Sequence, residues 1–291
     1  MTQQPIGLLA GAGDFPISFA RKAREMGLSI VTVALSGEAC RELRDHSAHF
    51  YWSGLARLGR MIKCFRRHGC HEVVMAGKVR KHNYLHRPWK LFTLWPDMRT
   101  IRWWYSRSRS DNKDDTLLLS VIREFEKEGL RVGSALETCP ELLAREGCLT
   151  RLAPDAAAMR DILFGWGLAR EMGRLDVGQS VAVKDMAVLA VEAIEGTDAA
   201  ILRAGSLCKS GKFTLVKVAK PNQDMRFDVP TVGVTTIRNL HQAGGRYLAI
   251  EAGKTILLNE AETLVTAEKL GICVVALKDP GTGTQPVLLA S

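Results

Sequence analysis

Short apolar runs alternate with helix-forming segments in the first part of the chain. Strand-like runs at 6–11, 28–35 and 72–77 are separated by segments at 15–27 and 55–68 that have the composition of helices. Strands that alternate with helices at this spacing form right-handed βαβ units with a parallel sheet. The pattern therefore predicts an α/β fold that begins with a Rossmann-like parallel sheet.

A second α/β pattern, of a different type, begins near residue 154. A helix-like segment at 154–173 precedes two alternating strands around a Lys184–Asp185 turn, and this pattern predicts a hairpin. Residues 247–259 also have the pattern of a hairpin, with its turn at Gly253. Other helices and strands surround these pairs, so we expect this part to be mixed α/β.

The length of the chain and the change of pattern predict two domains. We expect an N-terminal Rossmann-like domain at 1–134 and a C-terminal catalytic α/β domain at 137–278. The turn-rich residues 279–291 are expected to form a flexible tail. Ligands commonly bind where two domains meet, so we also expect an interdomain cleft.

The sequence favours the cytoplasm. No run approaches the roughly 20 apolar residues of a membrane-spanning helix, and the first residues lack the basic start of a signal peptide. The seven cysteines are scattered without a disulfide framework, as is typical of a reducing compartment. We therefore expect a cytoplasmic protein.

Positive charge is concentrated in residues 80–110, which we call the basic aromatic segment. It carries eight Lys or Arg residues against one acid, and four of the six tryptophans. Such a segment suits a solvated loop whose tryptophans pack inward, an anionic membrane surface, or single-stranded nucleic acid. The tryptophan content favours lipid over nucleic acid.

The turn GLLAGAGDFP at 7–16 places glycines between a strand and a helix. Amide groups at such a helix start can bind phosphate. A dinucleotide site is only weakly supported, because Pro16 occupies the place of the third glycine of that fingerprint. A tight turn with Asp14 as the helix cap is the structural alternative.

Acidic residues also gather at two other helix starts. Asp114 and Asp115 are adjacent, and Glu195 and Asp198 flank the end of a strand. Capping explains one of Asp114 and Asp115, and a ligand or metal role is the alternative for the other. At the second place Thr197 or Asp198 can cap the helix, and the alternative is that Glu195 and Asp198 bind a divalent metal.

The stretch KVAKPNQDMRFDVPTVG at 217–233 crowds both signs of charge after a strand-like run that turns at Pro221. In an extended chain, Asp224, Arg226 and Asp228 point to one face. Carboxylates can hold a metal while cations neutralise phosphoryl oxygens. A solvated turn is the alternative, but the density of both signs favours a magnesium–phosphate site.

Seven motifs resemble the UDP-2,3-diacylglucosamine pyrophosphatases of lipid A biosynthesis, of the two-domain type unrelated to the calcineurin-like enzymes of that step. The motifs are GLLAGAGDFP, EVVMAGKV, KDDTLL, RLDVGQSVAV, VEAIEGTDAAI, KVAKPNQDMRFDVPTVG and IEAGKTILLN. They keep this order from residue 7 to about residue 259. Two departures leave the acyl-chain preference open: Asn222 stands where many relatives have Gly, and the basic aromatic segment is unusually rich in Trp.

The resemblance implies a hydrolase that splits the pyrophosphate of UDP-2,3-diacylglucosamine into 2,3-diacylglucosamine 1-phosphate (lipid X) and UMP. It also implies Mg²⁺ as the cofactor, favours attack at the sugar-side phosphorus, and places the lipid product between the two domains. Asp224 is implied as the catalytic and metal-binding carboxylate, with Lys220 and Gln223 on phosphoryl oxygens and Asp198 as a second metal ligand. The substrate-binding residues implied are Gly11, Gly13, Asp14, Lys78, Thr197 and Asp198.

Acyl chains require access from a bilayer. We therefore expect peripheral association with the cytoplasmic face of the inner membrane, through the basic aromatic segment, and no nucleic acid as a partner. A homodimer stays open. The alternative functions are a nucleotide-dependent oxidoreductase, based on the turn at 7–16, and a nucleic-acid-binding module, based on 80–110.

Overall fold

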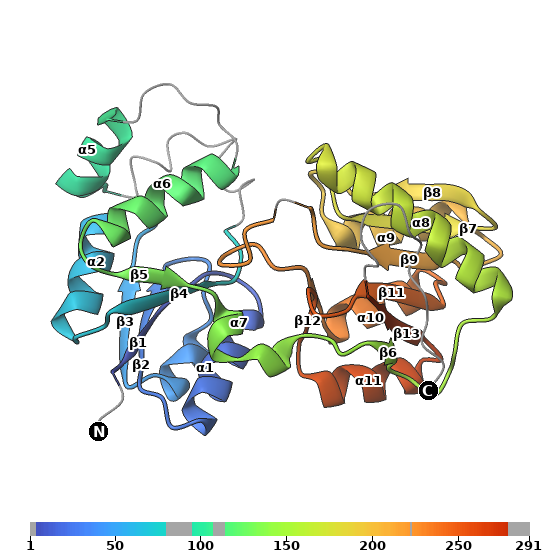
Figure 1. Ribbon diagram of the computed structural model, residues 1–291, viewed down its shortest axis with the longest axis horizontal. Coiled ribbons are helices and arrows are strands. Elements are labelled where there is room, and N and C mark those ends of the chain that lie inside the picture. Colours follow the sequence, from blue (N-terminus) through green and yellow to red (C-terminus); the bar gives the residue numbers. More distant parts are fainter. Residues whose placement is uncertain (1–3, 80–94, 107–113, 222, 279–291) are drawn as a thin grey trace. The chain divides into compact units, whose positions relative to one another are not determined.

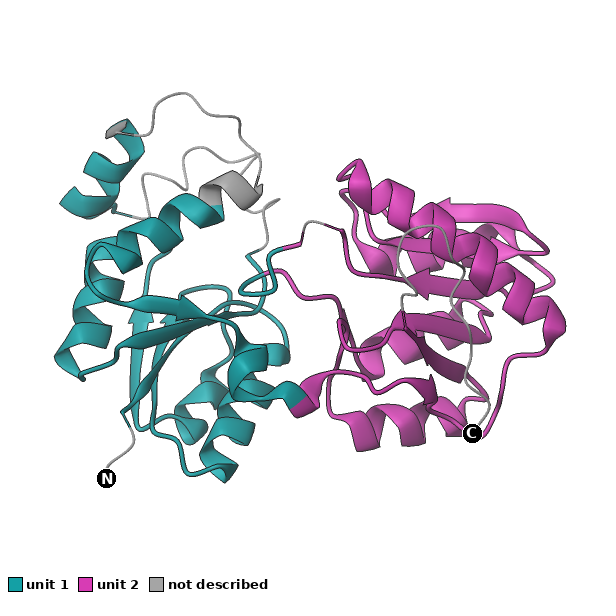
Figure 2. Cartoon of the chain, in the orientation of Figure 1, with its two compact units in different colours: residues 1–140, 224–227 teal, residues 141–223, 228–291 magenta. Residues whose placement is uncertain are grey.

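The computed structural model describes residues 4–79, 95–106, 114–221 and 223–278. Contacts between residues divide the chain into two compact units (Figure 2). Unit 1 comprises residues 1–140 and 224–227, and unit 2 comprises residues 141–223 and 228–291. The short segment 224–227 therefore belongs to unit 1, although its neighbours in sequence belong to unit 2.

The core of unit 1 is a five-stranded, all-parallel sheet in the order β3-β2-β1-β4-β5. Its strands are β1 (Ile6–Ala10), β2 (Ile30–Leu35), β3 (His49–Ser53), β4 (Glu72–Ala76) and β5 (Arg131–Gly133). The predicted parallel sheet is thus confirmed. The sequence pattern did not predict β3, which is an edge strand and is only partly buried.

Helices cover both faces of this sheet (Figure 1). They are α1 (Phe15–Glu25), α2 (Leu58–Arg67), α5 (Met98–Ser106), α6 (Asp114–Glu126) and α7 (Ala135–Thr138), with a 3-10 helix, η1 (Arg41–His46). On one face, Phe65 of α2 and Phe125 of α6 pack together with ring centroids 6.1 Å apart. The buried side chains of α2 recur every three or four residues, which is the spacing of one helix face (Leu58, Met61, Ile62 and Phe65).

The basic aromatic segment is described only in part. Residues 80–94 and 107–110 lie outside the described residues, as does the predicted tail at 279–291. Within the segment, Trp103 of α5 packs against the core of unit 1, whereas Trp104 and Tyr105 are exposed. Among the helices that the structure describes, none has the length and apolarity needed to cross a bilayer.

Unit 2 contains a mixed six-stranded sheet in the order β6-β13-β11-β9-β7-β8. Its strands are β6 (Gly147–Cys148), β7 (Ser180–Lys184), β8 (Ala187–Val191), β9 (Thr214–Lys217), β11 (Tyr247–Glu251) and β13 (Cys273–Leu277). The three strands β9, β11 and β13 are parallel, whereas β6 and β7 pair antiparallel with their neighbours. This arrangement confirms the mixed α/β character, and the antiparallel pair β7–β8 confirms the first hairpin.

The second predicted hairpin is wrong. Both edges of β11 are occupied, by β9 and by β13. The following strand β12 (Ile256–Leu257) instead pairs in parallel with β10 (Thr231–Val232), in a separate two-stranded sheet. Strand β11 cannot form a hairpin with β12, because it lies in the middle of the larger sheet.

Helices also cover both faces of the sheet of unit 2. Helix α8 (Ala156–Arg174) packs on one face, and α9 (Thr197–Leu207), α10 (Val234–Gln242) and α11 (Glu260–Lys269) pack on the other. Side chains alternate between the two faces along β9, so that Leu215 lies in one core and Val216 in the other. The buried run FTLVKVA at 213–219 therefore contributes side chains to both hydrophobic cores of unit 2.

Candidate active site

The carboxyl ends of three strands meet at one edge of the sheet in unit 2. Strand β7 is antiparallel to both β8 and β9, so β8 and β9 point the same way, and β11 is parallel to β9. Ligands of open α/β sheets bind outside the carboxyl ends of the strands. Glu192, Lys217 and Glu251 lie at these ends, together with the loops that contain the predicted residues Thr197, Lys220 and Gln223.

Lys217 is the central polar residue of this edge. Only 4% of it is exposed, although it carries a long cationic side chain. Its Nζ donates hydrogen bonds to Thr197 Oγ1, at 3.1 Å, and to the Thr231 carbonyl, also at 3.1 Å. A buried ammonium group requires such partners, because removing a charge from water is costly. Lys217 therefore ties the start of α9 to the strand β10.

Glu192 completes the contacts of Thr197. The Thr197 hydroxyl donates a hydrogen bond to Glu192 Oε1 at 2.9 Å, and it accepts the one from Lys217. Glu192 is 9% exposed, and its other oxygen, Oε2, has no hydrogen-bond partner among the described residues. Thr197, a predicted substrate-binding residue, is thus held by two charged residues that the sequence pattern did not single out. The neighbouring Asp198 is exposed, in the first turn of α9.

The loop after β9 brings Lys220 and Gln223 together, as expected for two residues of one site. Gln223 Oε1 accepts a hydrogen bond from the Lys220 backbone N–H at 2.8 Å, and the Gln223 backbone N–H donates to the Lys220 carbonyl at 3.1 Å. Lys220 Nζ binds Asp176 Oδ1 at 2.7 Å. Gln223 Nε2 is buried and has no hydrogen-bond partner among the described residues. A buried N–H donor without an acceptor costs free energy, so Gln223 Nε2 is well suited to donate to an oxygen of a ligand.

Glu251 anchors the same loop from the next strand. Its Oε2 accepts a hydrogen bond from the Ala219 amide at 2.8 Å, and its Oε1 forms an ion pair with Lys254 at 2.7 Å. Glu251 is almost completely buried. The carboxylate thereby fixes the point at which the chain leaves β9, directly before Lys220.

In unit 1, Gly11 and Lys78 lie side by side after β1 and β4. The Ala12 amide donates to the Lys78 carbonyl at 2.7 Å, and the Lys78 amide donates to the Ala12 carbonyl at 2.9 Å. A Cβ atom on Gly11 would lie 2.7 Å from the Lys78 carbonyl oxygen, so only glycine permits this approach. Because the amides of Gly11 and Ala12 are occupied by backbone carbonyls, they are not available for a phosphate.

Gly13 and Asp14 are the exposed part of that turn. Gly13 has a φ of +101°, a conformation that favours glycine, and Asp14 stands at the N-cap of α1. The Asp14 side chain makes no capping hydrogen bond, so its carboxylate is not used to start the helix. Asp14 thus occupies the cap position that the structural alternative predicted, without a side-chain capping bond, and it is exposed at the same edge as Lys78.

Asp224 is held by Arg226. The guanidinium donates to both carboxylate oxygens, from Nη2 to Oδ2 at 2.7 Å and from Nε to Oδ1 at 3.0 Å, and the Arg226 amide donates to Oδ1 at 3.0 Å. These hydrogen bonds lower the pKa of Asp224 and outweigh its partial burial, which acts in the opposite direction. Asp224 is therefore ionised at neutral pH.

The rest of the segment 224–227 fixes this pair to unit 1. Ser134, which follows β5, donates a hydrogen bond from its hydroxyl to the Met225 carbonyl at 2.7 Å. Phe227 packs against the core that contains Phe65. Arg226 also lies 3.7 Å from Glu126 of α6.

The predicted residues thus form local groups. Thr197 and Asp198 adjoin at the start of α9, Lys220 and Gln223 form one turn, and Gly11 and Lys78 are interlocked. The two predicted metal ligands, Asp198 and Asp224, belong to different units. In the part of the chain that the structure describes, no three His, Cys, Asp or Glu residues cluster as a metal site.

Five charged residues that hold these groups were not predicted as site residues: Asp176, Glu192, Lys217, Arg226 and Glu251. Lys217 had a signal, because a lysine inside an otherwise buried strand is unusual. Arg226 was interpreted as a cation that could neutralise phosphoryl oxygens, and not as the partner of Asp224. Glu192 had no such signal, since its position follows from the pairing of the strands.

Two α/β units with polar side chains at the carboxyl ends of their strands define a two-domain α/β protein. A family model described as the LpxI N-terminal domain matches residues 5–142, and one described as the LpxI C-terminal domain matches residues 145–275. The chain is also 34% identical over 286 residues to a protein of Caulobacter vibrioides named UDP-2,3-diacylglucosamine pyrophosphatase LpxI, covering 94% of this chain and 98% of that relative. The chain belongs to the LpxI family. The resemblance seen in the motifs is thereby confirmed, and neither alternative function gains support.

Proposed function

We propose that this protein hydrolyses the pyrophosphate of UDP-2,3-diacylglucosamine to 2,3-diacylglucosamine 1-phosphate and UMP. The similarity to the Caulobacter relative across both domains is the observation that carries this proposal. Water supplies the oxygen of the new P–O bond, the bridging P–O bond breaks, and the leaving phosphate takes the bonding electrons. The proton of the water passes to solvent or to a base at the site.

Asp224 is proposed to orient the attacking water. Its low pKa keeps the carboxylate ionised, so it can accept a hydrogen bond from water throughout the neutral range. The clamp by Arg226 fixes the direction of both oxygens. A fixed acceptor of this kind lowers the barrier mainly through positioning.

Lys220 and Gln223 are proposed to bind phosphoryl oxygens. The ammonium group of Lys220 supplies positive charge, and the unpartnered Nε2 of Gln223 supplies an oriented donor. Charge that develops on the phosphoryl group in the transition state is stabilised by donors already in place.

Mg²⁺ is proposed as the cofactor, with Asp224 and Asp198 as its ligands. An ionised carboxylate suits this ion, which usually binds one or two protein carboxylates together with waters and substrate phosphates. The amide, Nε and Nη2 of Arg226 donate to the Asp224 carboxylate, which offers about four acceptor positions, so about one position is left for a metal. When bound, Mg²⁺ would neutralise phosphoryl charge.

The direct test is incubation with UDP-2,3-diacylglucosamine and Mg²⁺, followed by measurement of UMP. Asp224→Asn keeps the shape of the side chain and removes its charge, and we expect a loss of at least about 100-fold in kcat. Asp185→Asn, at an exposed turn between β7 and β8, is the matched control and should retain full activity. Full activity of Asp224→Asn would refute the site, and no UMP from the wild type would refute the function.

Attack at the sugar-side phosphorus is proposed as well. Hydrolysis in ¹⁸O-labelled water should place the label in 2,3-diacylglucosamine 1-phosphate, since that phosphorus receives the water oxygen. Mass spectrometry of both products measures this directly. Label in UMP would show that the uridine-side phosphorus is attacked instead.

A diacylated substrate resides in a membrane, so we propose that the protein acts in the cytoplasm at the inner-membrane surface. The exposed residues Trp104 and Tyr105 of α5 support a peripheral contact.

A further inference from the structure

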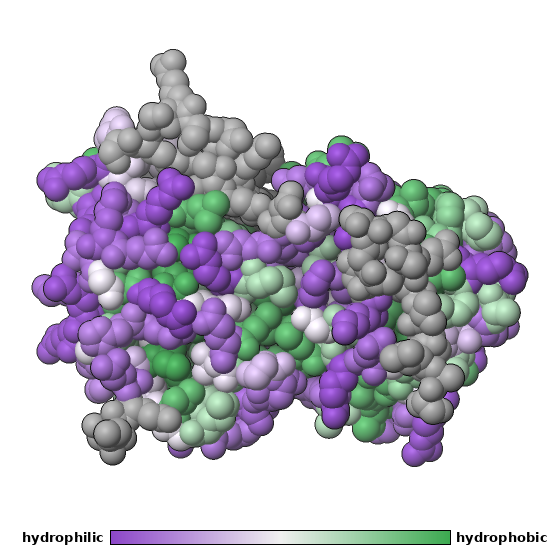
Figure 3. Space-filling view, viewed as in Figure 1, coloured by the Kyte–Doolittle hydropathy of each residue, from purple (hydrophilic) through white to green (hydrophobic). Residues whose placement is uncertain are grey.

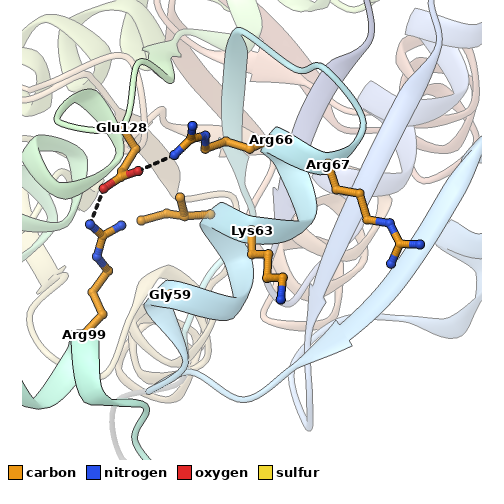
Figure 4. Close-up of a pocket in the computed structure, with 7 residues that line it drawn as sticks. Gly59, Lys63, Arg66, Arg67, Arg99 and Glu128 are labelled. Carbon is orange, nitrogen blue, oxygen red and sulfur yellow. Dashed lines mark hydrogen bonds and ion pairs between the residues drawn. The ribbon is translucent and has the colours of Figure 1, made fainter.

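A basic cavity lies on unit 1, between α2, α5 and the end of α6. Its volume is about 520 Å³, and it is open to solvent. We call it the α2–α5 basin (Figure 4). Its lining residues are Gly59, Ile62, Lys63, Arg66, Arg67, Arg99 and Glu128.

Positive charge exceeds negative charge in the α2–α5 basin. Four cationic side chains and one carboxylate line it. Glu128 binds Arg66 at 2.6 Å and also pairs with Arg99, and these contacts lower the pKa of Glu128. The single carboxylate is therefore ionised, and it orients two arginines at once.

Lys63 and Arg67 are the remaining cations. They project from α2 away from Glu128 (Figure 4), and neither has an ion-pair partner among the described residues. The surface over α2 is mostly hydrophilic (Figure 3). Lys63 and Arg67 stand four residues apart on α2, so their like charges repel one another, and an anion that bound between them would relieve the repulsion.

The helix that contributes Arg99 also exposes apolar side chains. Met98 is 72% exposed, Trp104 is 59% exposed and Tyr105 is 84% exposed. Met98, Arg102 and Tyr105 are spaced so that they share one face of α5. Aromatic and apolar side chains beside cations are typical of helices that lie at the interface between water and lipid.

We propose that the α2–α5 basin and the exposed face of α5 form the surface by which this protein docks on a bilayer, with the phosphate of an anionic phospholipid in the basin. This proposal rests on the proposed function, because a diacylated substrate must be reached in a membrane. Lys63 and Arg67 bind the phosphate, Arg66 and Arg99 border it, and the side chains of α5 enter the headgroup layer.

A lipid explains the site better than a soluble nucleotide. Among the residues that the structure describes, the lining of the basin is aliphatic and charged, without an aromatic ring on which a base could stack. The aromatic side chains are instead on the adjoining helix, where they can insert beside a headgroup.

The test is co-sedimentation with vesicles of phosphatidylglycerol and phosphatidylethanolamine in equal amounts, compared with phosphatidylcholine vesicles. The wild type should bind the anionic vesicles, and more weakly as salt is raised. Lys63→Gln with Arg67→Gln should weaken binding about 30-fold, which corresponds to about 1 kcal/mol for each of the two cations. Lys209→Gln with Lys269→Gln, on exposed residues of unit 2, is the matched control and should bind as the wild type does.

A second variant tests the apolar half of the surface. Met98→Ser with Tyr105→Ser should weaken binding even at high salt, because insertion of these apolar side chains is not screened. Wild-type binding by the Lys63 and Arg67 variant would overturn the proposal. So would equal binding to phosphatidylcholine, or displacement of the vesicles by single-stranded RNA.

Hydrolysis of detergent-dispersed substrate separates docking from catalysis. Both docking variants should hydrolyse it as fast as the wild type, while they are slow on substrate held in vesicles. Vesicle binding by a wild type that releases no UMP would refute the proposed function and leave the docking surface standing. Normal UMP release without vesicle binding would refute the docking surface alone.

Discussion

Asp224 and Arg226 form an ion pair in which the arginine orients the carboxylate and lowers its pKa. The carboxylate alone would be partly buried, and burial raises the pKa of an acid. The guanidinium reverses that effect by donating to both oxygens, so the pKa of Asp224 is lowered. We therefore assign Arg226 as a positioning residue for Asp224.

Replacing Arg226 by Gln should shift the pH dependence of the reaction. A lowered pKa means that Asp224 loses its charge only in strong acid, so the wild type should have no acidic limb in the neutral range. In Arg226→Gln, the guanidinium is lost and only the backbone amide of residue 226 still opposes the effect of burial, so the pKa of Asp224 rises. The acidic limb of kcat/KM should then move to higher pH.

The pH profile of kcat/KM from pH 4 to 9 measures this shift. Arg238→Gln, on an exposed arginine of α10, is the control and should leave the profile unchanged. An Arg226→Gln protein that lost activity with no displacement of the limb would contradict the assignment, because a purely structural role would have that result.

Lys217 acts through Thr197. Lys217→Met keeps the length of the side chain and removes the hydrogen bonds to Thr197 and to the Thr231 carbonyl. We expect kcat to fall about 10-fold to 100-fold with little change in KM, since a hydrogen bond to a charged group contributes about 1.5–3 kcal/mol. Thr197→Ser keeps the hydroxyl and should stay active.

A double-mutant cycle separates this effect from general damage. Lys217 and Thr197 are joined by one hydrogen bond, so their effects should not add. The double variant Lys217→Met with Thr197→Val should be as active as the less active of the two single variants. Losses that multiplied would show that the two residues act independently.

At the scale of the elements, the loops after β1 and β4 depend on one glycine. A methyl group at Gly11 would lie 2.7 Å from the Lys78 carbonyl oxygen. Gly11→Ala should therefore lower the free energy of unfolding by about 1–3 kcal/mol. Urea denaturation measures this change.

Gly167→Ala is the matched control. Gly167 is exposed on α8, and a methyl group there would meet no atom within 4 Å. Alanine is the better helix former, so the free energy of unfolding should rise by about 1 kcal/mol. Equal effects of the two substitutions would contradict the close approach of the two loops.

The pattern of residues predicted the elements well where it was regular. The alternation of apolar runs and helices predicted β1, β2 and β4 of the parallel sheet, and the Lys184–Asp185 turn predicted a true hairpin. The pattern failed at 247–259, where two apolar runs around a glycine do not pair. The partner of a strand depends on the order of all strands in the sheet, and a local turn motif does not predict that order.

At the scale of the whole molecule, each unit carries residues that are proposed to bind substrate. Hydrogen exchange with and without 2,3-diacylglucosamine 1-phosphate tests each unit by itself, because contact with ligand slows exchange of the amides it covers. We expect protection at Gly13–Asp14 in unit 1 and at the loop from Glu192 to Asp198 in unit 2. A place that showed no protection would refute the proposed binding residues of that unit.

The order of the motifs along the chain was enough to identify the family, and the pattern of apolar and helical segments was enough to predict the parallel first sheet and the mixed second sheet. It was also enough to bring Lys220 and Gln223 into one turn, because they are neighbours in sequence. It was not enough for Glu192, which directly follows β8, and Lys217, which ends β9, although the two meet at Thr197. The partners of a side chain at a strand end depend on the order and direction of the strands, and long-range hydrogen bonding sets that order after the local pattern has formed the strands.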